Sequence, residues 1–147
     1  MFYWIDNDIP APQQFDPSDA RWVEIWNDVF MQYRKTESGA FELLAKPNVD
    51  TGMGLERTLT VLDGKISVYD TELFLPLIAA LKSQQTIEHG NTTRFLRIIA
   101  DHMRASAFII TDGVEPSNKD RGYVLRRLLR RSLVYAKQLG MHAGWYT

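Results

Sequence analysis

The stretch Asp50-Thr51-Gly52-Met53-Gly54-Leu55-Glu56-Arg57 decides how this chain is interpreted. An acid precedes two glycines, and an arginine follows the second glycine by three residues. Glycine lacks Cβ, so it permits positive φ and lets a ligand lie against the backbone. The leucines at positions 55, 59 and 62 share one side of a helix that Gly64 would end, and its first turn would offer N–H groups to an anion. We therefore expect a ligand-holding loop before a helix over residues 55–62, with an ordinary tight turn as the alternative.

Upstream of this stretch the pattern predicts antiparallel strands. Residues 2–5 are aromatic and form a short strand, and residues 7–20 contain three prolines and form a loop. Residues 22–35 alternate over part of their length, which predicts a half-buried strand, with a helix as the alternative. A turn at residues 37–39 leads to a returning strand at residues 41–44. These strands form an incomplete antiparallel meander.

Downstream of the glycines the pattern is helical. We expect helices over residues 72–83, from a cap at Thr93 to Gly113, and over residues 123–139 with Gly140 as terminator. Residues 84–92 are polar and predict a linker. The fold class is therefore α+β, an antiparallel sheet followed by an α-helical region, divided into residues 1–83 and residues 84–147.

Composition narrows the function classes. The chain has 147 residues, a net charge of −1 and no cysteine, which excludes a disulfide framework and a thiolate metal site. No apolar run approaches the ~20 residues that span a bilayer, so we expect a cytoplasmic protein with no membrane contact. The three histidines lack ligand spacing, and His102 is expected to be a hydrogen-bonded core residue.

The charges are unevenly distributed along the chain. Residues 1–93 carry 7 Lys+Arg and 14 Asp+Glu, whereas residues 94–147 carry 10 and 4. The last predicted helix concentrates the positive charge in Arg126, Arg127, Arg130 and Arg131, opposite an apolar stripe of Leu125, Leu128, Leu129, Leu133 and Ala136. An RNA backbone is the natural partner of such a face. The alternative is a solvated face paired with acids such as Asp101, Asp112 or Asp120.

Several stretches together resemble class II aminoacyl-tRNA synthetases, in the form found in alanyl-tRNA synthetases. Residues 50–57 resemble the third signature motif of that class. Three further stretches resemble the segment that follows the catalytic domain in that family: Ala100-Asp101-His102, Asp112-Gly113-Val114-Glu115-Pro116-Ser117-Asn118 and Arg121-Gly122-Tyr123-Val124-Leu125-Arg126-Arg127. The resemblance runs from about residue 2 to residue 140. Nothing in the chain resembles the first two motifs, so we expect a middle piece of a longer enzyme.

The resemblance implies roles for individual side chains. Arg57, the catalytic residue, would lie over the adenine of ATP and help neutralise its phosphates; a salt bridge with Glu56 or a nearby acid is the alternative. Asp50 would accept hydrogen bonds from the ammonium group of alanine and Asn27 would orient it, with a loop cap and a satisfied strand amide as alternatives. Asn118 would lie near the third base pair of the tRNA acceptor stem. Further residues implied are Trp26, Val49 and Gly52 for alanine, Gly52 and Gly54 for ATP, and Arg126, Arg127, Arg130 and Arg131 for tRNA.

The function that follows from this resemblance is that of a portion of an alanine–tRNA ligase. Its partners would be alanine, ATP with Mg²⁺ and the acceptor stem of tRNA(Ala), and the chain itself would bind no metal. The chain alone would be inactive, because the motif 2 arginine that holds the α-phosphate is missing. Two alternatives stay open: a stand-alone tRNA-binding accessory module derived from a synthetase, and one chain of a split synthetase whose second chain carries motifs 1 and 2.

Overall fold

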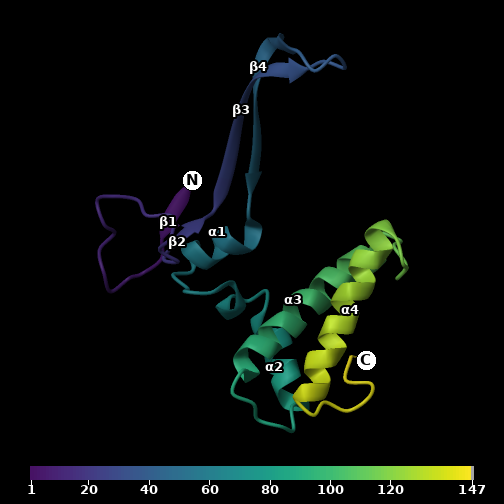
Figure 1. Cartoon of the computed structure of the whole chain (residues 1–147). Coiled ribbons are helices and arrows are strands. Elements are labelled where there is room, and N and C mark those ends of the chain that lie inside the picture. Colours follow the sequence, from purple (N-terminus) through teal and green to yellow (C-terminus); the bar gives the residue numbers. More distant parts are fainter. Residues whose placement is uncertain (147) are drawn as a thin grey trace. The chain divides into compact units, whose positions relative to one another are not determined.

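A computed structural model describes residues 1–146 of the chain, which form two compact units (Figure 1). Unit 1 is Met1–Thr71 and holds the strands, whereas unit 2 begins at Glu72 and is helical. Small antiparallel sheets and four α-helices confirm the predicted α+β class. The predicted functional division between residues 83 and 84 stays a prediction.

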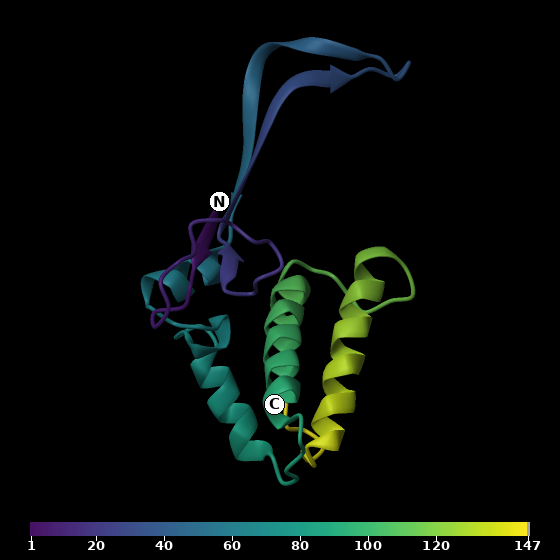
Figure 2. The ribbon, with the colours of Figure 1, turned by 60° about the vertical axis from the view of Figure 1, so that its left-hand side comes forward.

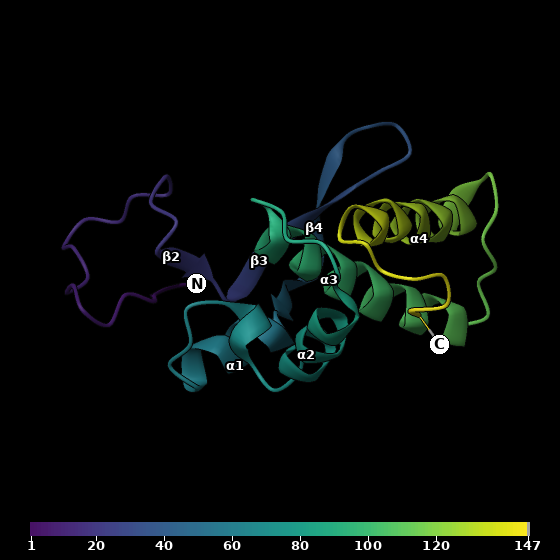
Figure 3. The ribbon, with the colours of Figure 1, turned by 90° about the horizontal axis from the view of Figure 1, so that it is seen from below.

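Unit 1 begins with a two-stranded antiparallel sheet of β1 (Phe2–Trp4) and β2 (Trp22–Glu24). The predicted proline-rich segment between them is an open loop (Figure 3). Two ring contacts hold this segment: Phe2 packs on Phe15 within the loop at 4.8 Å, and Trp4 packs on Trp22 across its ends at 5.2 Å, between ring centroids. Together these ring contacts tie the loop to the small sheet.

Arg21 anchors the end of this loop. Its guanidinium lies 4.5 Å from the Trp4 ring centroid and 2.6 Å from a carboxylate oxygen of Asp19. Hydrogen bonds from the side chain and backbone of Arg21 lower the pKa of Asp19 to about 2. The loop is therefore held by one cation that contacts both a ring and a carboxylate.

A second antiparallel pair, β3 (Trp26–Lys35) and β4 (Phe41–Met53), forms a long hairpin. The returning strand is much longer than the predicted residues 41–44. Its register shifts between Met31 and Tyr33, where residues 44–47 of β4 face a single residue of β3. Pro47 lies in this bulge, where its missing N–H costs the ladder nothing, and Figure 2 shows the hairpin bending along its length.

The hairpin is exposed, so the prediction of a half-buried strand was wrong. All of β3 after Trp26 is solvent-exposed, and the pair has no third strand among the described residues. A two-stranded ribbon with no covering layer leaves both faces in solvent. Its exposed large apolar side chains are Val29, Phe30, Met31, Tyr33, Phe41, Leu43, Val49 and Met53.

The strand β4 leads directly into α1 (Leu55–Leu62), whose bounds match the prediction. Asp63 is its C-cap, and Gly64 then takes φ +60°, the left-handed conformation expected of a glycine after a helix. A short 3₁₀ helix, η1 (Val68–Asp70), closes unit 1. The motif stretch therefore forms a strand–helix junction.

Unit 2 consists of α2 (Leu75–Gln84), α3 (Thr92–Thr111) and α4 (Asp120–Gln138). The predicted start of α2 at residue 72 was wrong, because Pro76 lies in its first turn, the position that tolerates a missing N–H. Asn91, and not Thr93, is the N-cap of α3. Gly113 and Gly140 take φ +80° and +69° after their helices, as predicted for helix terminators.

The helices α3 and α4 pack along a seam to which α4 contributes both small and bulky residues. Six of the buried or half-buried positions of α4 follow one another at alternating spacings of three and four: Gly122, Leu125, Leu129, Ser132, Ala136 and its C-cap Leu139. They face the buried side chains Phe95, Leu96, Ile99, Ala100 and Ser106 of α3. The predicted stripe was wrong at Leu133, which is 49% exposed, because Ser132 takes the buried position beside it.

The predicted linker over residues 84–92 connects two helices of the same unit. Thr86 and Ile87 donate backbone hydrogen bonds of 3.0 and 3.1 Å to the carbonyl of Leu139. A Cβ on Gly140 would lie 2.7 Å from Ile87 Cγ1, so this contact requires glycine. The segment is therefore packed against the end of α4.

Candidate functional site

The hairpin register brings several predicted site residues to one face. Asn27 pairs with Gly52, and Val29 pairs with Asp50, so Asn27, Gly52 and Asp50 share that face. The side chains of opposed residues project from the same side of an antiparallel ladder. The register therefore supports the predicted grouping of Asn27 with Asp50.

Trp26 and Val49 project from the other face of the hairpin. Trp26 pairs with Met53, and Val49 pairs with Phe30. Trp26 and Val49 are therefore each one residue away from Asn27 and Asp50 along their strands, and their side chains point the opposite way. On that face the indole N–H of Trp26 donates to Thr51 Oγ1. The structure therefore does not bring these two side chains beside Asp50, and their predicted role around alanine is a prediction without support from the register.

Thr51 links this second face into a short polar chain that the sequence reasoning missed. Besides accepting from Trp26, its hydroxyl donates to Asp28 Oδ1 at 2.7 Å. The sequence held one signal for this chain of hydrogen bonds. Thr51 and Asp28 are each adjacent to a predicted site residue, and adjacent residues of a strand point to opposite faces. The chain fixes the orientation of the Trp26 ring next to the strand–helix junction.

The two glycines do not form the predicted loop with positive φ. Gly52 lies within β4, and Gly54 is the N-cap of α1 with φ −77°. A Cβ on Gly52 would meet no heavy atom within 4 Å, and one on Gly54 would meet only the Arg57 side chain at ordinary distances. The protein's own packing therefore does not require glycine here, and the backbone surface at Gly52 is open.

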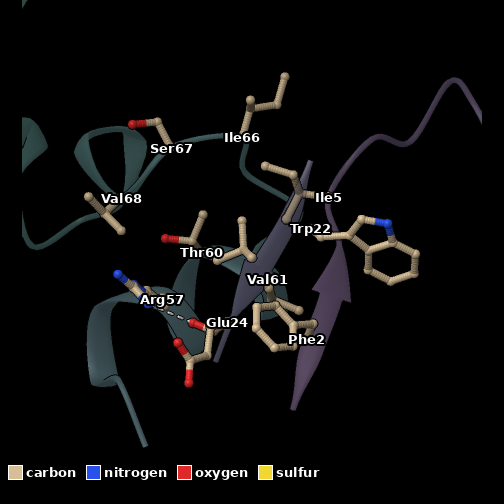
Figure 4. Close-up of a pocket in the computed structure, with 11 residues that line it drawn as sticks. Phe2, Ile5, Trp22, Glu24, Arg57, Thr60, Val61, Ile66, Ser67 and Val68 are labelled. Atoms are coloured by element: carbon tan, nitrogen blue, oxygen red, sulfur yellow. Dashed lines mark hydrogen bonds between the residues drawn. The ribbon is translucent and has the colours of Figure 1, made fainter. Parts of the chain in front are cut away.

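Arg57 lies one turn into α1 and folds over the junction. Its Nη1 donates a hydrogen bond of 3.0 Å to the carbonyl of Glu24, drawn as a dashed line in Figure 4. Among residues 1–146 no carboxylate lies within 4.0 Å of this guanidinium, so the predicted alternative of a salt bridge with Glu56 is not what the structure shows. The charge of Arg57 therefore has no internal counter-ion in the described chain.

Two cavities of unit 1 meet at Arg57. One cavity of about 260 Å³ is lined by Glu24, Ile25, Trp26, Asn27, Gly52, Gly54 and Arg57. The other, of about 440 Å³, is mostly apolar and is lined by side chains that include Phe2, Trp22, Val61 and Arg57 (Figure 4). The sequence reasoning did not assign Phe2 or Trp22 to a site, because an aromatic strand residue is more often a core residue. A planar cation between a polar cavity and an apolar one can contact an anion and a ring together.

The arginines of α4 form the second candidate surface, which we call the arginine face: Arg126, Arg127, Arg130 and Arg131. All four are exposed, whereas Leu128 and Leu129 between them are half-buried, as predicted. No carboxylate lies within 4.0 Å of any of the four among the described residues, so pairing with nearby acids does not occur. Arg127 and Arg131 instead lie 5.8 Å from the ring centroids of Tyr123 and Tyr135.

Asn118 lies in the turn before α4, close to the arginine face. Its side-chain oxygen accepts a hydrogen bond from Arg126 Nη1. The structure therefore brings two of the predicted tRNA-binding residues into contact with each other.

His102 is held as expected of a structural histidine. Its ring Nδ1 lies 3.0 Å from the carboxylate of Asp101, and its side chain is 13% exposed. Within residues 1–146 no group of three His, Asp or Glu side chains is placed to hold a metal ion. The same residues include no helix long and apolar enough to cross a membrane.

Comparison with known proteins identifies the family. The model of the family described as tRNA synthetases class II (A) matches residues 5–147. The chain belongs to this class II tRNA synthetase family. Relatives in the family include an alanine–tRNA ligase from Acidithiobacillus ferridurans, 46% identical over 99% of this chain, and one from Lawsonia intracellularis, 52% identical over 83%. An alanine–tRNA ligase from Borrelia hermsii is 50% identical over 86% of the chain.

The matched region is a small part of these class II synthetases. The chain spans 17%, 14% and 22% of the length of the three relatives, respectively. The predicted second chain carrying motifs 1 and 2 receives no support from the comparisons. The predicted resemblance to alanyl-tRNA synthetases is confirmed, whereas the roles of individual residues stay predictions.

Proposed function

We propose that this chain forms part of the alanine- and ATP-binding site, and part of the acceptor-stem surface, of an alanine–tRNA ligase. The proposal for alanine and ATP binding rests on the geometry of the strand–helix junction. The junction places Asn27, Gly52, Gly54 and Arg57 around one cavity of about 260 Å³, next to an open backbone surface. Open backbone beside a guanidinium that has no carboxylate partner suits a phosphate-bearing ligand.

In this proposal each group has a distinct task. Arg57 contacts the adenine ring and neutralises phosphate charge, because its guanidinium is planar and has no internal carboxylate partner. Asp50, on the same hairpin face as Asn27, accepts hydrogen bonds from the ammonium group of alanine. Mg²⁺ enters with ATP as part of the substrate, where it neutralises phosphate charge.

The test is a segment exchange into a full-length relative. Residues 5–147 replace the matching segment of the A. ferridurans ligase, and alanine-dependent exchange of pyrophosphate into ATP is measured. Asp50→Asn should raise the apparent KM for alanine far more than that for ATP, since a charge-assisted hydrogen bond lost in a closed site costs ~2–4 kcal/mol. Glu37→Gln, in the exposed hairpin turn, is the matched control and should change neither. Equal losses for both substrates would assign Asp50 a structural role.

The second half of the proposal rests on the arginine face. Four exposed guanidinium groups without carboxylate partners repel one another unless an anion binds. A double-stranded RNA stem supplies phosphates at the required density. Arg130→Ala should weaken RNA binding and reduce the slope of log K against log salt by roughly one unit.

The exposed arginine face also favours a second candidate function, a stand-alone tRNA-binding module. The arginine face belongs to unit 2, whereas Asp50 and Arg57 belong to unit 1. A stand-alone module would keep its RNA affinity when Asp50 and Arg57 are both replaced by Ala. A ligase chimera that carries residues 5–147 of this chain would then fail to support pyrophosphate exchange. Activity of the chimera that depends on Asp50 would exclude this alternative.

A further inference from the structure

The turn that carries Asn118 is fixed to the start of α4. Ser117 N–H donates 3.0 Å to the carbonyl of Gly122, and Ser117 Oγ donates 3.0 Å to the carbonyl of Lys119. A Cβ on Gly122 would lie only 2.5 Å from the carbonyl oxygen of Glu115, so the turn touches the helix backbone itself. Asp120 completes the turn with φ +48°, a left-handed conformation that is uncommon outside glycine. Packing therefore defines the backbone that presents Asn118.

The contact with Arg126 orients the side-chain amide of Asn118. Arg126 Nη1 faces its amide, and a guanidinium has donors only, so the amide oxygen must face Arg126. The NH₂ group then points away from Arg126. Among the described residues this Nδ2 has no hydrogen-bond partner, and Asn118 is exposed. The amide thus presents its donor to solvent and keeps its acceptor occupied.

We propose that Arg126 is a positioning residue that makes Asn118 a donor-presenting probe of RNA base edges. The inference rests on the proposed RNA-binding function and deepens it. An amide with its oxygen held internally favours a base edge that offers an acceptor, such as a pyrimidine carbonyl oxygen or a purine ring nitrogen. A freely rotating amide would accept or donate with equal ease and would distinguish base pairs less well.

Arg126 differs in this respect from the rest of the arginine face. Arg127 and Arg131 lie over tyrosine rings, and Arg130 has no ion pair, hydrogen bond or ring contact among residues 1–146. Arg130 is therefore the matched comparison: it carries the same charge one turn further along α4 and contacts no recognition group. Removal of Arg130 should change charge alone, whereas removal of Arg126 should also release the Asn118 amide.

The binding experiment uses the 147-residue chain and four acceptor-stem RNA hairpins that differ only in their third base pair. Dissociation constants are measured at several salt concentrations. The parent chain should prefer one hairpin, and Arg126→Ala should reduce that preference by about 5- to 10-fold, the effect of one hydrogen bond. Arg126→Lys, which keeps a donor, should retain most of the preference. Arg130→Ala should lower the salt slope and leave the preference unchanged, and Lys137→Ala, outside the arginine face, should change neither.

Asn118→Asp provides a sharper variant, because it is isosteric. The carboxylate still accepts from Arg126, so the turn is kept, but the outward group becomes an acceptor. The preferred hairpin should therefore change in identity. If Asn118→Asp keeps the parent's order of preference, or if Arg126→Ala lowers affinity equally for all four hairpins, Arg126 is only a phosphate contact and the proposal is wrong.

A measurement without RNA tests the positioning step separately. The side-chain NH₂ resonances of Asn118 are followed by ¹⁵N NMR in the parent and in Arg126→Ala. A held amide gives a high heteronuclear NOE that falls in the variant, whereas an unchanged NOE would contradict positioning. If the parent binds none of the hairpins, the proposed RNA function fails, and recognition by Asn118 fails with it. A drop of the NOE in that case would still establish the contact, so the two failures are distinguishable.

Discussion

Gly122 packs directly against the turn before α4, and this leads to a quantitative prediction for Gly122→Ala. In an ordinary helix this substitution stabilises by up to ~1 kcal/mol. Here the new Cβ would lie closer than 3.0 Å to Ser117 Oγ and 2.5 Å from the carbonyl oxygen of Glu115. To relieve this overlap the turn must move and lose two hydrogen bonds of Ser117, those to Gly122 and to Lys119, at ~1 kcal/mol each. Residual overpacking adds ~1 kcal/mol.

The net expectation is destabilisation by about 2 kcal/mol, opposite in sign to the usual effect of Gly→Ala in a helix. For a unit of this size that lowers Tm by roughly 8–16 °C. Thermal unfolding followed by circular dichroism at 222 nm reports mainly on unit 2, because α2, α3 and α4 contain most of the helical residues. Gly90→Ala is the matched control, since a Cβ there meets nothing within 4 Å, and should leave Tm nearly unchanged.

A companion variant tests the cause of the loss. Ser117→Gly in the Gly122→Ala background removes one of the two overlaps and leaves the Glu115 carbonyl in place, so stability should recover only in part. If Gly122→Ala is as stable as the parent chain, the turn is not fixed to the helix as described. Packing against α4 would then not define the backbone of Asn118.

Three further predictions follow from other parts of the chain. Because Arg21 holds the pKa of Asp19 at about 2, below its ordinary value of 3.8, Asp19 stabilises the folded chain above about pH 4 and loses this effect as the pH falls through 2. Urea unfolding followed by tryptophan fluorescence should therefore show a stability difference between the parent and Asp19→Asn at pH 7 that becomes small as the pH approaches 2. The exposed apolar side chains of the hairpin should make the parent chain self-associate in sedimentation velocity, and Phe30→Lys and Phe41→Lys, at side chains 79% and 70% exposed, should reduce that association without lowering Tm; a lower Tm would show that these rings are packed. The purified chain alone should show no alanine-dependent pyrophosphate exchange above background, and clear activity would refute the expected need for the motif 2 arginine.

The sequence predicted well those features that depend on neighbouring residues. The bounds of α1 followed from leucines at helical spacing and from Gly64 beyond the last turn, and both are local signals. The glycines after α3 and α4 were predicted for the same reason, because a left-handed residue after a helix is set by the chain itself. The exposed arginine face likewise follows from helical periodicity alone.

Features that depend on residues far apart in the sequence were predicted less well. Whether Trp26 and Val49 share a face with Asp50 depends on the hairpin register, and a shift of one residue exchanges the faces. Hydrophobicity placed Leu133 in the core, but the packing of α4 on α3 buries the neighbouring Ser132 instead. The hydrogen bond of Arg126 to Asn118 joins a turn to the second turn of a helix, a geometry that no spacing rule encodes.

The alternating three- and four-residue spacing of the α4 seam fixes the rotational phase of that helix. Each residue turns an α-helix by about 100°, so one residue inserted between Leu125 and Leu129 would rotate everything after it by more than a quarter turn. Arg130 and Arg131 would then move toward α3, and Ser132 and Ala136 would move out into solvent. Insertion of seven residues, two nearly complete turns, would instead restore the phase to within about 20°. This helix should therefore tolerate many substitutions on its outer side but almost no change in length, and natural length variation in relatives should be confined to the turns at its two ends.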